Sequence, residues 1–416
     1  MSEHAQTNDR RARVGIEKLR AYPGALSLDL ELLGRARGAA PGYAWDTLAG
    51  RTRSLNPGWE DPVTMAVNAA KPMLTAEDLA AIELVIVGTE SSPDQGKPLS
   101  TFVARYLGVQ RNCRNFECKH ACYGGTSAVM MAAHWVASGV APGKKALVLC
   151  TDESRRNLRV EWEYVMGACA VALLISACPD VLELELESNG YVSEEVGDTF
   201  RPTSRDEAGN TEQSLYSYMD ALDGAYQHFQ RKNPGLDYER DFAAHIYHLP
   251  FSGMARRAHR AVQKLNGQAA RDPHSYDRKV EPSTRYASLI GGSYTASTSL
   301  ALMSLLDHSE SLRAGDRISV YSYGSGSCGE FYSARIGARA REQVARAGLR
   351  ELLAARESLS VADYEAVENE RAAAVDQRDF RPARDGLQNL YGRTYAGSGR
   401  LVSRGVRGFF REYEWS

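Results

Sequence analysis

The sequence has 416 residues, of which 50 are Lys or Arg, 52 are Asp or Glu and seven are Cys. A chain of this length can bury a large core, which excludes a disulfide scaffold or a small binding module and allows roughly two or three domains. The charges nearly cancel, so a nucleic-acid partner is not expected. Residues 1–13 lack the apolar run of a signal peptide, and no stretch reaches the ~18 apolar residues of a membrane span. We expect a soluble cytoplasmic protein with reduced thiols.

Short apolar runs rich in β-branched residues alternate with longer helical patterns along the chain. Runs of this kind predict strands buried on both faces, and hence an α/β fold. A nearly uncharged run of helix formers, residues 124–138, predicts a helix buried on nearly every side. The predicted strands are residues 84–87, 146–149, 246–249 and 318–321.

Three further segments have distinct polarity. Residues 254–266 predict an amphipathic helix with a basic, solvated face formed by Arg256, Arg257, Arg260 and Lys264. The polar stretch 188–214 contains several glycines and is either a linker or an excursion that lines a site. The charge-rich helical stretch 339–384 predicts a solvated outer layer.

Cys122 is a candidate nucleophile. It precedes a pair of glycines and the uncharged helix, so its sulfur would lie at a helix N-terminus, where backbone dipoles favour a thiolate and lower its pKa. Two alternatives remain open. Cys122 could be a small apolar core residue, or it could bind a metal with Cys113, Cys118 and His120, although this run lacks a paired C-x-x-C and a second ligand pair.

Glu90 and His248 are candidate partners of that cysteine. Glu90 follows the first predicted strand, and a carboxylate at the end of a buried parallel strand projects into the ligand crevice of α/β folds. An apolar pocket would raise its pKa and suit it to proton transfer. Taken singly, Glu90 fits a surface or helix-start acid and His248 a hydrogen-bonded core residue. With Cys122 they would form a nucleophile and its acid/base partners.

A glycine-rich loop follows the last predicted strand. Its residues Gly324, Ser325 and Gly326 would let backbone N–H groups approach a reacting oxygen, as an oxyanion hole requires. A phosphate loop is disfavoured because the G-x-x-x-x-G-K-[ST] pattern is missing. A plain tight turn is the alternative.

In chain order, these segments resemble 3-hydroxy-3-methylglutaryl-CoA synthase, a member of the thiolase superfamily. The similarity spans most of residues 14–415. It is carried by VGIEKLRAYPGALSLDLELLGRARG near the start, VGTES around Glu90, ECKHACYGGT around Cys122, YHLPFSGM around His248, and by YGSGSCGEF and LSVADYE further on.

The resemblance implies a thiolase fold, five-layered αβαβα and built from two similar halves, residues 1–180 with Glu90 and Cys122 and residues 181–416 with His248. It also implies a homodimer. In the family the Cys is acylated, the Glu removes an α-proton, the enolate attacks a β-ketone, the His positions and polarises the acceptor thioester, and water releases the product. Cys122, Glu90 and His248 match these positions.

Within the family, the runs DTFRPTS (198–204) and SLYSYMD (214–220) look like the branch that works on polyketide assembly lines. That branch implies a donor acyl-ACP, acetyl or propionyl, and an acceptor polyketide-ACP (ACP, acyl carrier protein). The substrates would be phosphopantetheine thioesters on ACP or CoA, and no metal, cofactor or membrane is implied. The basic helix 254–266 would suit an acidic ACP, and an ordinary solvated face is the alternative.

Two departures from the family leave the acceptor open. Gly292 stands where the family usually has Asn, and Arg156-Asn157 stand where the simple synthases have Tyr-Gly. The rival functions are a CoA-using synthase of isoprenoid precursor supply, a ketoacyl synthase III of fatty-acid initiation, and an inactive scaffold that binds carrier proteins.

Overall fold

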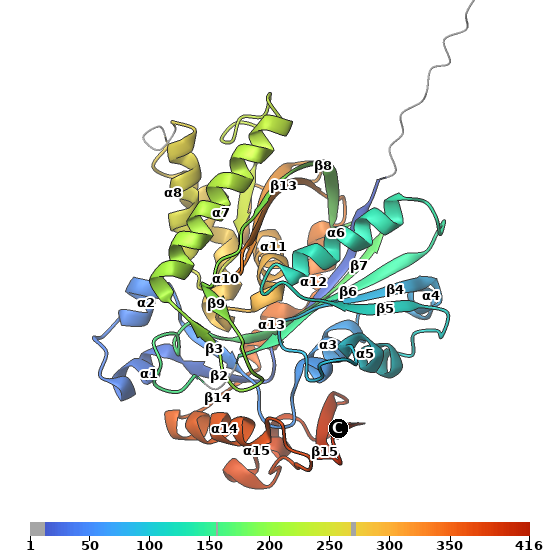
Figure 1. Ribbon diagram of the computed structural model, residues 1–416, viewed down its shortest axis with the longest axis vertical. Coiled ribbons are helices and arrows are strands. Elements are labelled where there is room, and N and C mark those ends of the chain that lie inside the picture. The colour runs from blue at the N-terminus through green and yellow to red at the C-terminus, as the bar shows by residue number, and fades with distance from the viewer. Residues whose placement is uncertain (1–12, 155–156, 268–271) are drawn as a thin grey trace, which may run out of the picture.

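The computed structural model describes residues 13–154, 157–267 and 272–416. Within them, the largest sheet has the strand order β11-β12-β13-β8-β1-β7-β6-β4-β5, of which Figure 1 labels β13, β8, β7, β6, β4 and β5. Two groups of strands meet where β1 and β8 pair over only two residues each. The first group is β1 (Gly15–Tyr22), β4 (Ile82–Gly88), β5 (Arg114–Cys118), β6 (Lys145–Glu153) and β7 (Ala168–Ser176); the second is β8 (Leu182–Ser193), β11 (Ala244–Tyr247), β12 (Arg317–Gly324) and β13 (Cys328–Ile336).

The four predicted strands are confirmed as β4, β6, β11 and β12, although residues 248–249 of the predicted run 246–249 lie beyond β11. β11 ends at Tyr247, so His248 lies just beyond it. β4 is parallel to both of its neighbours, β5 and β6. The carboxyl ends of these three strands therefore meet at one edge, where α/β folds place their sites. The predicted division after residue 180 falls between β7 and β8, and as a domain boundary it stays a prediction.

Helices and strands alternate in five layers, as the resemblance implies. One outer layer is α3 (Pro62–Ala70) and α5 (Leu99–Leu107), and the middle layer is α6 (Gly124–Ala137) and α11 (Ser297–His308). The other outer layer is α7 (Thr211–Lys232) with α8 (Met254–Leu265), on the opposite side of the molecule from α3 and α5 (Figure 1). Two separate apolar cores cover the two faces of the first strand group.

The predicted helices are confirmed, with one difference in burial. α6 buries its Ala128 and Ala132 side but leaves Met131 48% exposed. The expectation that α6 is buried on nearly every side is therefore wrong for the single chain, because nothing within the described residues covers its outer face. None of the described helices is long and apolar enough to cross a membrane.

The C-terminal segment packs on the first half of the chain. The stretch predicted as a solvated layer is helical, but its helix at Val361–Ala374 buries Tyr364 and Val367 in the same core as Trp59, so it also belongs to a core. The elements in and beneath this core are α1 (Leu30–Arg37), α2 (Tyr43–Leu48), β2 (Leu26–Asp29), β3 (Thr52–Leu55), β14 (Glu357–Ser358), α14 (Val361–Ala374), α15 (Gly386–Thr394), β15 (Leu401–Arg407) and β16 (Phe410–Trp415). The remaining helices are α4 (Ala76–Ala81), α9 (Ser275–Lys279), α10 (Glu281–Ile290), η1 (Tyr294–Ala296), α12 (Ala340–Ala347) and α13 (Leu349–Ala354), and a short hairpin is formed by β9 (Thr199–Phe200) and β10 (Ala208–Gly209).

Candidate active site

Close backbone packing places Cys122 at the end of β4. The residue lies between β5 and the start of α6. A Cβ atom on Gly88 would lie 2.6 Å from the carbonyl oxygen of Gly124, and one on Gly125 would lie 2.1 Å from that of Thr295. Glycine is needed at both positions because only a residue without a side chain lets β4, α6 and η1 come this close.

Cys122 and Glu90 are in direct contact. The Cys122 thiol donates a hydrogen bond to Glu90 Oε1, with 3.2 Å between the heavy atoms. Burial raises the pKa of Glu90 to about 7, against the opposing effect of Arg201, while the nearby Asp152 and Glu207 raise it further. The expectation of a raised Glu90 pKa is confirmed, and the group can take or release a proton near neutral pH.

The expectation of a lowered pKa for Cys122 is wrong. Burial, followed by the charge of Glu90, raises the pKa of this thiol well above its usual value. A helix N-terminus favours a thiolate, but here desolvation and an adjacent carboxylate outweigh that effect. In the resting protein Cys122 is therefore a thiol, with a proton acceptor already in contact.

His248 is held by backbone bonds and surrounded by aromatic rings. Its N–H donates to the Tyr321 carbonyl (2.7 Å), and its own carbonyl accepts from the Tyr218 hydroxyl (2.9 Å). The imidazole lies beside the rings of Tyr218 and Tyr323. Burial lowers the pKa of His248 to about 3, so the ring is neutral and presents one donor and one acceptor.

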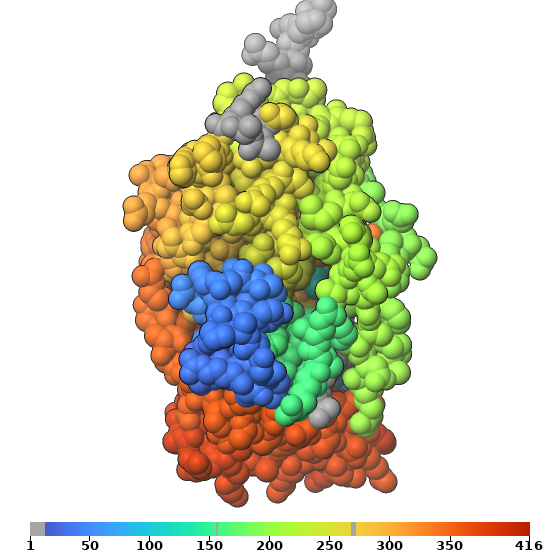
Figure 2. All heavy atoms as spheres, turned by 90° about the vertical axis from the view of Figure 1, so that its left-hand side faces the viewer, coloured from blue at the N-terminus to red at the C-terminus, as the bar shows by residue number. Residues whose placement is uncertain are grey.

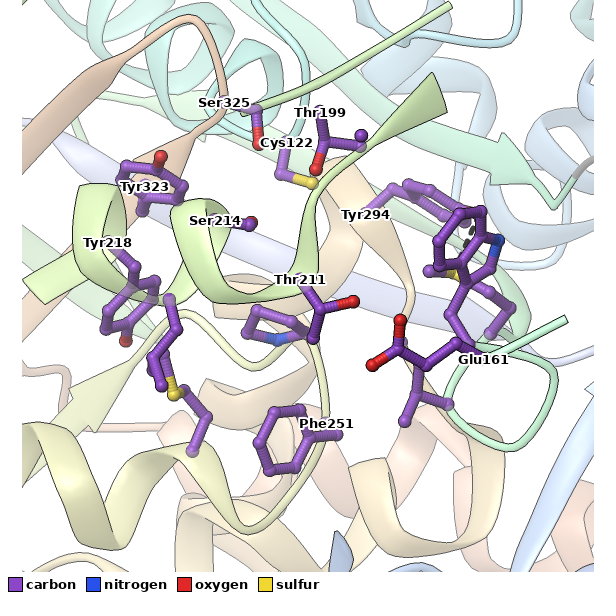
Figure 3. A pocket seen from close by; sticks show the side chains of 18 of the residues that line it. Cys122, Glu161, Thr199, Thr211, Ser214, Tyr218, Phe251, Tyr294, Tyr323 and Ser325 are labelled. Atoms are coloured by element: carbon purple, nitrogen blue, oxygen red, sulfur yellow. Dashed lines mark hydrogen bonds between the residues drawn. The ribbon is translucent and has the colours of Figure 1, made fainter. Parts of the chain in front are cut away.

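A cavity of about 500 Å³ brings the three predicted residues together. Glu90, Cys122 and His248 all line it. Figure 3 shows this cavity from close by, with Cys122, Thr199 and Ser325 among the labelled residues that line it. The opening lies between α2, α7, α8 and residues 157–166, which surround the hollow seen in Figure 2. Its walls are mainly apolar and include Leu48, Trp162, Val165, Met166, Leu215, Phe251 and Met254.

Asp152 is a site residue to which the sequence reasoning assigned no role, although it belongs to a run that resembles a pocket-lining segment of the family. It is completely buried at the end of β6. Its Oδ1 accepts from the Glu90 N–H (2.8 Å), the Thr89 hydroxyl (3.0 Å) and the Ser91 hydroxyl (2.7 Å), and its Oδ2 accepts from the Thr295 N–H (3.1 Å). These bonds fix the turn that carries Glu90. The argument applied to Glu90, a carboxylate at the end of a buried strand, would have found Asp152.

The polar stretch 188–214 forms part of the cavity wall, so it is not a linker. It contains the end of β8 and a hairpin of β9 (Thr199–Phe200) and β10 (Ala208–Gly209). Thr199, Glu207 and Asn210 line the cavity. Arg201, from the same hairpin, is buried and donates to the Glu90 carbonyl (2.9 Å). The sequence allowed this stretch to line a site but gave no role to Arg201 or Glu207, because their contacts with Glu90 and with each other exist only in the fold.

The glycine-rich loop joins β12 to β13. The completely buried Asp198 accepts from the Gly326 N–H (2.9 Å) and the Tyr323 hydroxyl (2.8 Å), so the Gly326 amide is already bonded. A Cβ on Gly324 would lie 2.6 Å from the Tyr123 nitrogen, which requires glycine beside the Cys122 segment. Ser325 lines the cavity. An oxyanion role for the loop stays a prediction.

The backbone leaves no room for a side chain at Gly292, one of the two departures. A Cβ here would lie 2.5 Å from the Pro250 carbonyl oxygen and 3.1 Å from that of Val165. Arg156 lies outside the described residues. Its neighbour Asn157 is buried and accepts from Trp162 Nε1 (3.1 Å), so it shapes the cavity wall.

Two other expectations concern the cysteines and the basic helix. All seven cysteines are free. Across the described ranges, no group of three or more His, Cys, Asp or Glu residues is arranged to hold a metal, so the run around Cys122 forms no ligand set.

On α8, Arg256, Arg257, Arg260 and Lys264 are exposed, and Arg257 also lines the cavity opening.

Five alternating layers with a cysteine, a carboxylate and a histidine in one buried cavity define a thiolase-fold acyltransferase. Residues 12–180 match the family described as hydroxymethylglutaryl-coenzyme A synthase N terminal, and residues 257–397 match its C terminal. The chain therefore belongs to the hydroxymethylglutaryl-CoA synthase family, and it is an enzyme of that type.

Individual relatives give the same result. The chain is 37% identical over 366 residues to the polyketide biosynthesis 3-hydroxy-3-methylglutaryl-ACP synthase PksG of Bacillus subtilis (84% of this chain, 87% of PksG). It is 34% identical over 359 residues to a hydroxymethylglutaryl-CoA synthase of Enterococcus faecalis (85% and 91%). The crystal structure of the curacin biosynthetic pathway HMG synthase superposes with a TM-score of 0.92 at 38% identity (97% and 100%).

Proposed function

We propose that this protein adds the enolate of an acyl thioester, acetyl or propionyl, to the β-ketone of an ACP-bound polyketide. The product is a β-branched 3-hydroxy-3-methylglutaryl-type thioester on that ACP. The contact between Cys122 and Glu90, at 3.2 Å in a cavity that also contains His248, carries the proposal. The similarity to PksG and to the curacin enzyme supports the polyketide branch.

Acylation is the first step. The Cys122 sulfur attacks the carbonyl carbon of the donor thioester, and its proton passes to Glu90 along the existing hydrogen bond. The phosphopantetheine thiolate then leaves and takes that proton, so Glu90 is ionised again. A pKa of about 7 lets the carboxyl group both accept and release the proton near neutrality.

Condensation and release follow on the same residues. Glu90 removes a proton from the α-carbon of the acyl group on Cys122, and the enolate carbon bonds to the β-carbonyl carbon of the acceptor. The proton on Glu90 moves to the new alkoxide, and water cleaves the Cys122 thioester to leave a carboxylate on the product. No metal or organic cofactor is needed, because the thioester itself acidifies the α-carbon.

The acceptor side depends on His248 and the cavity wall. The neutral imidazole donates a hydrogen bond to the acceptor thioester, which positions and polarises it. Gly292 supplies no side chain for this task. The apolar walls formed by Trp162, Leu215 and Phe251 suit the alkyl part of an acceptor chain.

Donor and acceptor ACPs are the partners in this proposal. The curacin enzyme has been solved in complex with holo donor-ACP, at 38% identity to this chain. The exposed basic face of α8 lies at the cavity opening through Arg257, where it would meet an acidic carrier. We place the protein in the cytoplasm, because its cysteines are free.

A homodimer is also part of the proposal. β5 is the last strand of its sheet, with one edge unpaired among the described residues. Beside it, Val140 and Met131 are 70% and 48% exposed, and Val140 shares a hollow with Arg114 of β5. We expect sedimentation to give a molecular mass of twice 45.7 kDa. Val140→Asp should reduce this mass to that of one chain, whereas the control Leu32→Asp on α1 should leave it unchanged. A monomeric wild type would contradict this proposal.

Donor choice tests the function. The protein is incubated with acetyl-ACP or acetyl-CoA, its intact mass is measured, and acetoacetyl-ACP is then added for product analysis. We expect acetyl transfer from acetyl-ACP and a branched product on the acceptor ACP. Transfer from CoA alone would favour the CoA-using synthase, and transfer from neither donor would favour an inactive scaffold.

A further inference from the structure

Arg201 is bonded to the turn that carries Glu90. Its side chain is 8% exposed and comes from the β9–β10 hairpin. Nη1 donates to the Glu90 carbonyl (2.9 Å) and to the Ser91 hydroxyl (2.9 Å), and Nη2 donates to the Glu153 carbonyl (3.4 Å). The guanidinium also lies over the Tyr294 ring, 4.9 Å from its centroid. These contacts fix a full positive charge at the rim of the catalytic turn.

The remaining donor of Arg201 faces the Glu90 carboxylate. Its Nε is buried without a hydrogen-bond partner and lies 3.9 Å from Glu90 Oε2. The other oxygen, Oε1, accepts from the Cys122 thiol. A buried N–H without a hydrogen-bond partner costs free energy of folding, so we expect another state of the protein to supply an acceptor for it.

Acylation of Cys122 creates that state. The acylated sulfur has no proton to donate, so Glu90 loses its bond to Cys122 at the moment it must act as a base. A small movement of the carboxylate then brings Oε2 within hydrogen-bond distance of Arg201 Nε. The new charge-assisted bond would hold the ionised carboxylate in one orientation.

Glu207 limits the effect of this charge. Its side chain is 5% exposed, and Oε2 accepts from Arg201 Nη2 at 3.2 Å. A fully unopposed arginine would make Glu90 too weak a base near neutral pH. The ionisable groups that face Glu90 are Arg201, Glu207, Asp152, Cys122 and Tyr294.

We propose that Arg201 is a positioning residue that orients and holds ionised the Glu90 carboxylate after acylation of Cys122, and that Glu207 is its counter-ion. This inference rests on the proposed function, because it takes Glu90 as the base of the condensation step.

The test measures the condensation rate against pH, in single turnovers of pre-acetylated protein with acetoacetyl-ACP. Arg201→Met removes the positive charge, so the acid limb of the profile moves up by about 1 to 3 pH units. Glu207→Gln removes a negative charge with little change in shape, so the same limb moves down, by roughly half a unit. Arg201→Lys keeps the positive charge but loses the planar guanidinium and its several N–H donors. The acid limb therefore stays near its wild-type pH while the condensation rate falls about tenfold.

If Arg201 and Glu207 only stabilised the fold, their two variants would not move the acid limb of the pH profile in opposite directions. Arg205→Met is the matched control, since Arg205 lies on the same hairpin but is 52% exposed and pairs with Asp376. We expect wild-type behaviour from it. The inference would be overturned if the acid limb moved in the same direction in Arg201→Met and Glu207→Gln. If Arg201→Met fails to fold, an unshifted acid limb in Glu207→Gln would overturn it alone. Wild-type condensation by Glu90→Ala would instead overturn the proposed function.

Discussion

Cys122 Sγ donates a hydrogen bond to Glu90 Oε1 across 3.2 Å, although the two residues are 32 positions apart and come from different elements. The nucleophile and the base are thus linked by one hydrogen bond, which exists while Cys122 is a thiol and is lost when the sulfur is acylated. Burial keeps the thiol protonated and brings the carboxyl pKa to about 7, so acylation itself frees Glu90 for its second task.

The first prediction concerns stability. Burial raises the pKa of Glu90 from 4.5 to about 7, so the cost of this carboxyl group to folding grows as the pH rises from about 4.5 to 7 and is constant above pH 7. We expect Glu90→Gln to raise the free energy of unfolding by about 1 to 3 kcal/mol at pH 8, and to change it little at pH 5. Denaturant unfolding at the two pH values checks this. An equal effect at both would contradict the raised pKa.

The second prediction concerns Gly292. Introducing the family's usual residue by Gly292→Asn would drive a Cβ into the Pro250 carbonyl, 2.5 Å away. We expect a loss of about 1 to 3 kcal/mol of stability and slower condensation. Gly235→Asn is the control, since a Cβ there meets nothing within 4 Å. A Gly292→Asn protein that is as stable as wild type and faster in condensation would show that the site accepts the asparagine.

The third prediction concerns the basic face of α8. Arg260 and Lys264 are exposed there and do not line the cavity. Reversing both charges, by Arg260→Glu and Lys264→Glu, should raise KM for acyl-ACP about tenfold and leave acetyl-CoA turnover unchanged. The distant, exposed Arg381→Glu is the control. Equal effects on both donors, or none on acyl-ACP, would place the carrier surface elsewhere.

The local pattern of apolar residues predicted several strands and the position of one site residue. β4, β6, β11 and β12 follow from continuous apolar runs, and Glu90 follows from its place at the end of one of them. The family resemblance supplied the layers and the grouping of Glu90, Cys122 and His248, which no single run could give. Contacts between distant segments decide the rest.

The raised pKa of Glu90 was predictable in this way, but the electrostatics of Cys122 were not. The pKa of Cys122 depends on a carboxylate that only the fold brings near, so an argument from the helix N-terminus alone gave the wrong sign. Arg201 and Glu207 belong to a polar stretch that reads as a loop, and they become site residues because the hairpin folds over Glu90. The exposure of Met131 likewise depends on what covers α6.

The most direct test separates acylation from condensation in Glu90→Ala. Intact mass after incubation with acetyl-ACP reports the first step, and the branched product formed on acetoacetyl-ACP reports the second. Cys122→Ala controls for acylation elsewhere and should gain no acetyl mass. We predict that Glu90→Ala still gains one acetyl group, but more slowly than wild type because the Cys122 thiol has lost its proton acceptor, while condensation falls by about 10²- to 10⁴-fold. A folded Glu90→Ala protein that is acetylated as fast as wild type, or one that condenses at the wild-type rate, would contradict the roles assigned to Cys122 and Glu90.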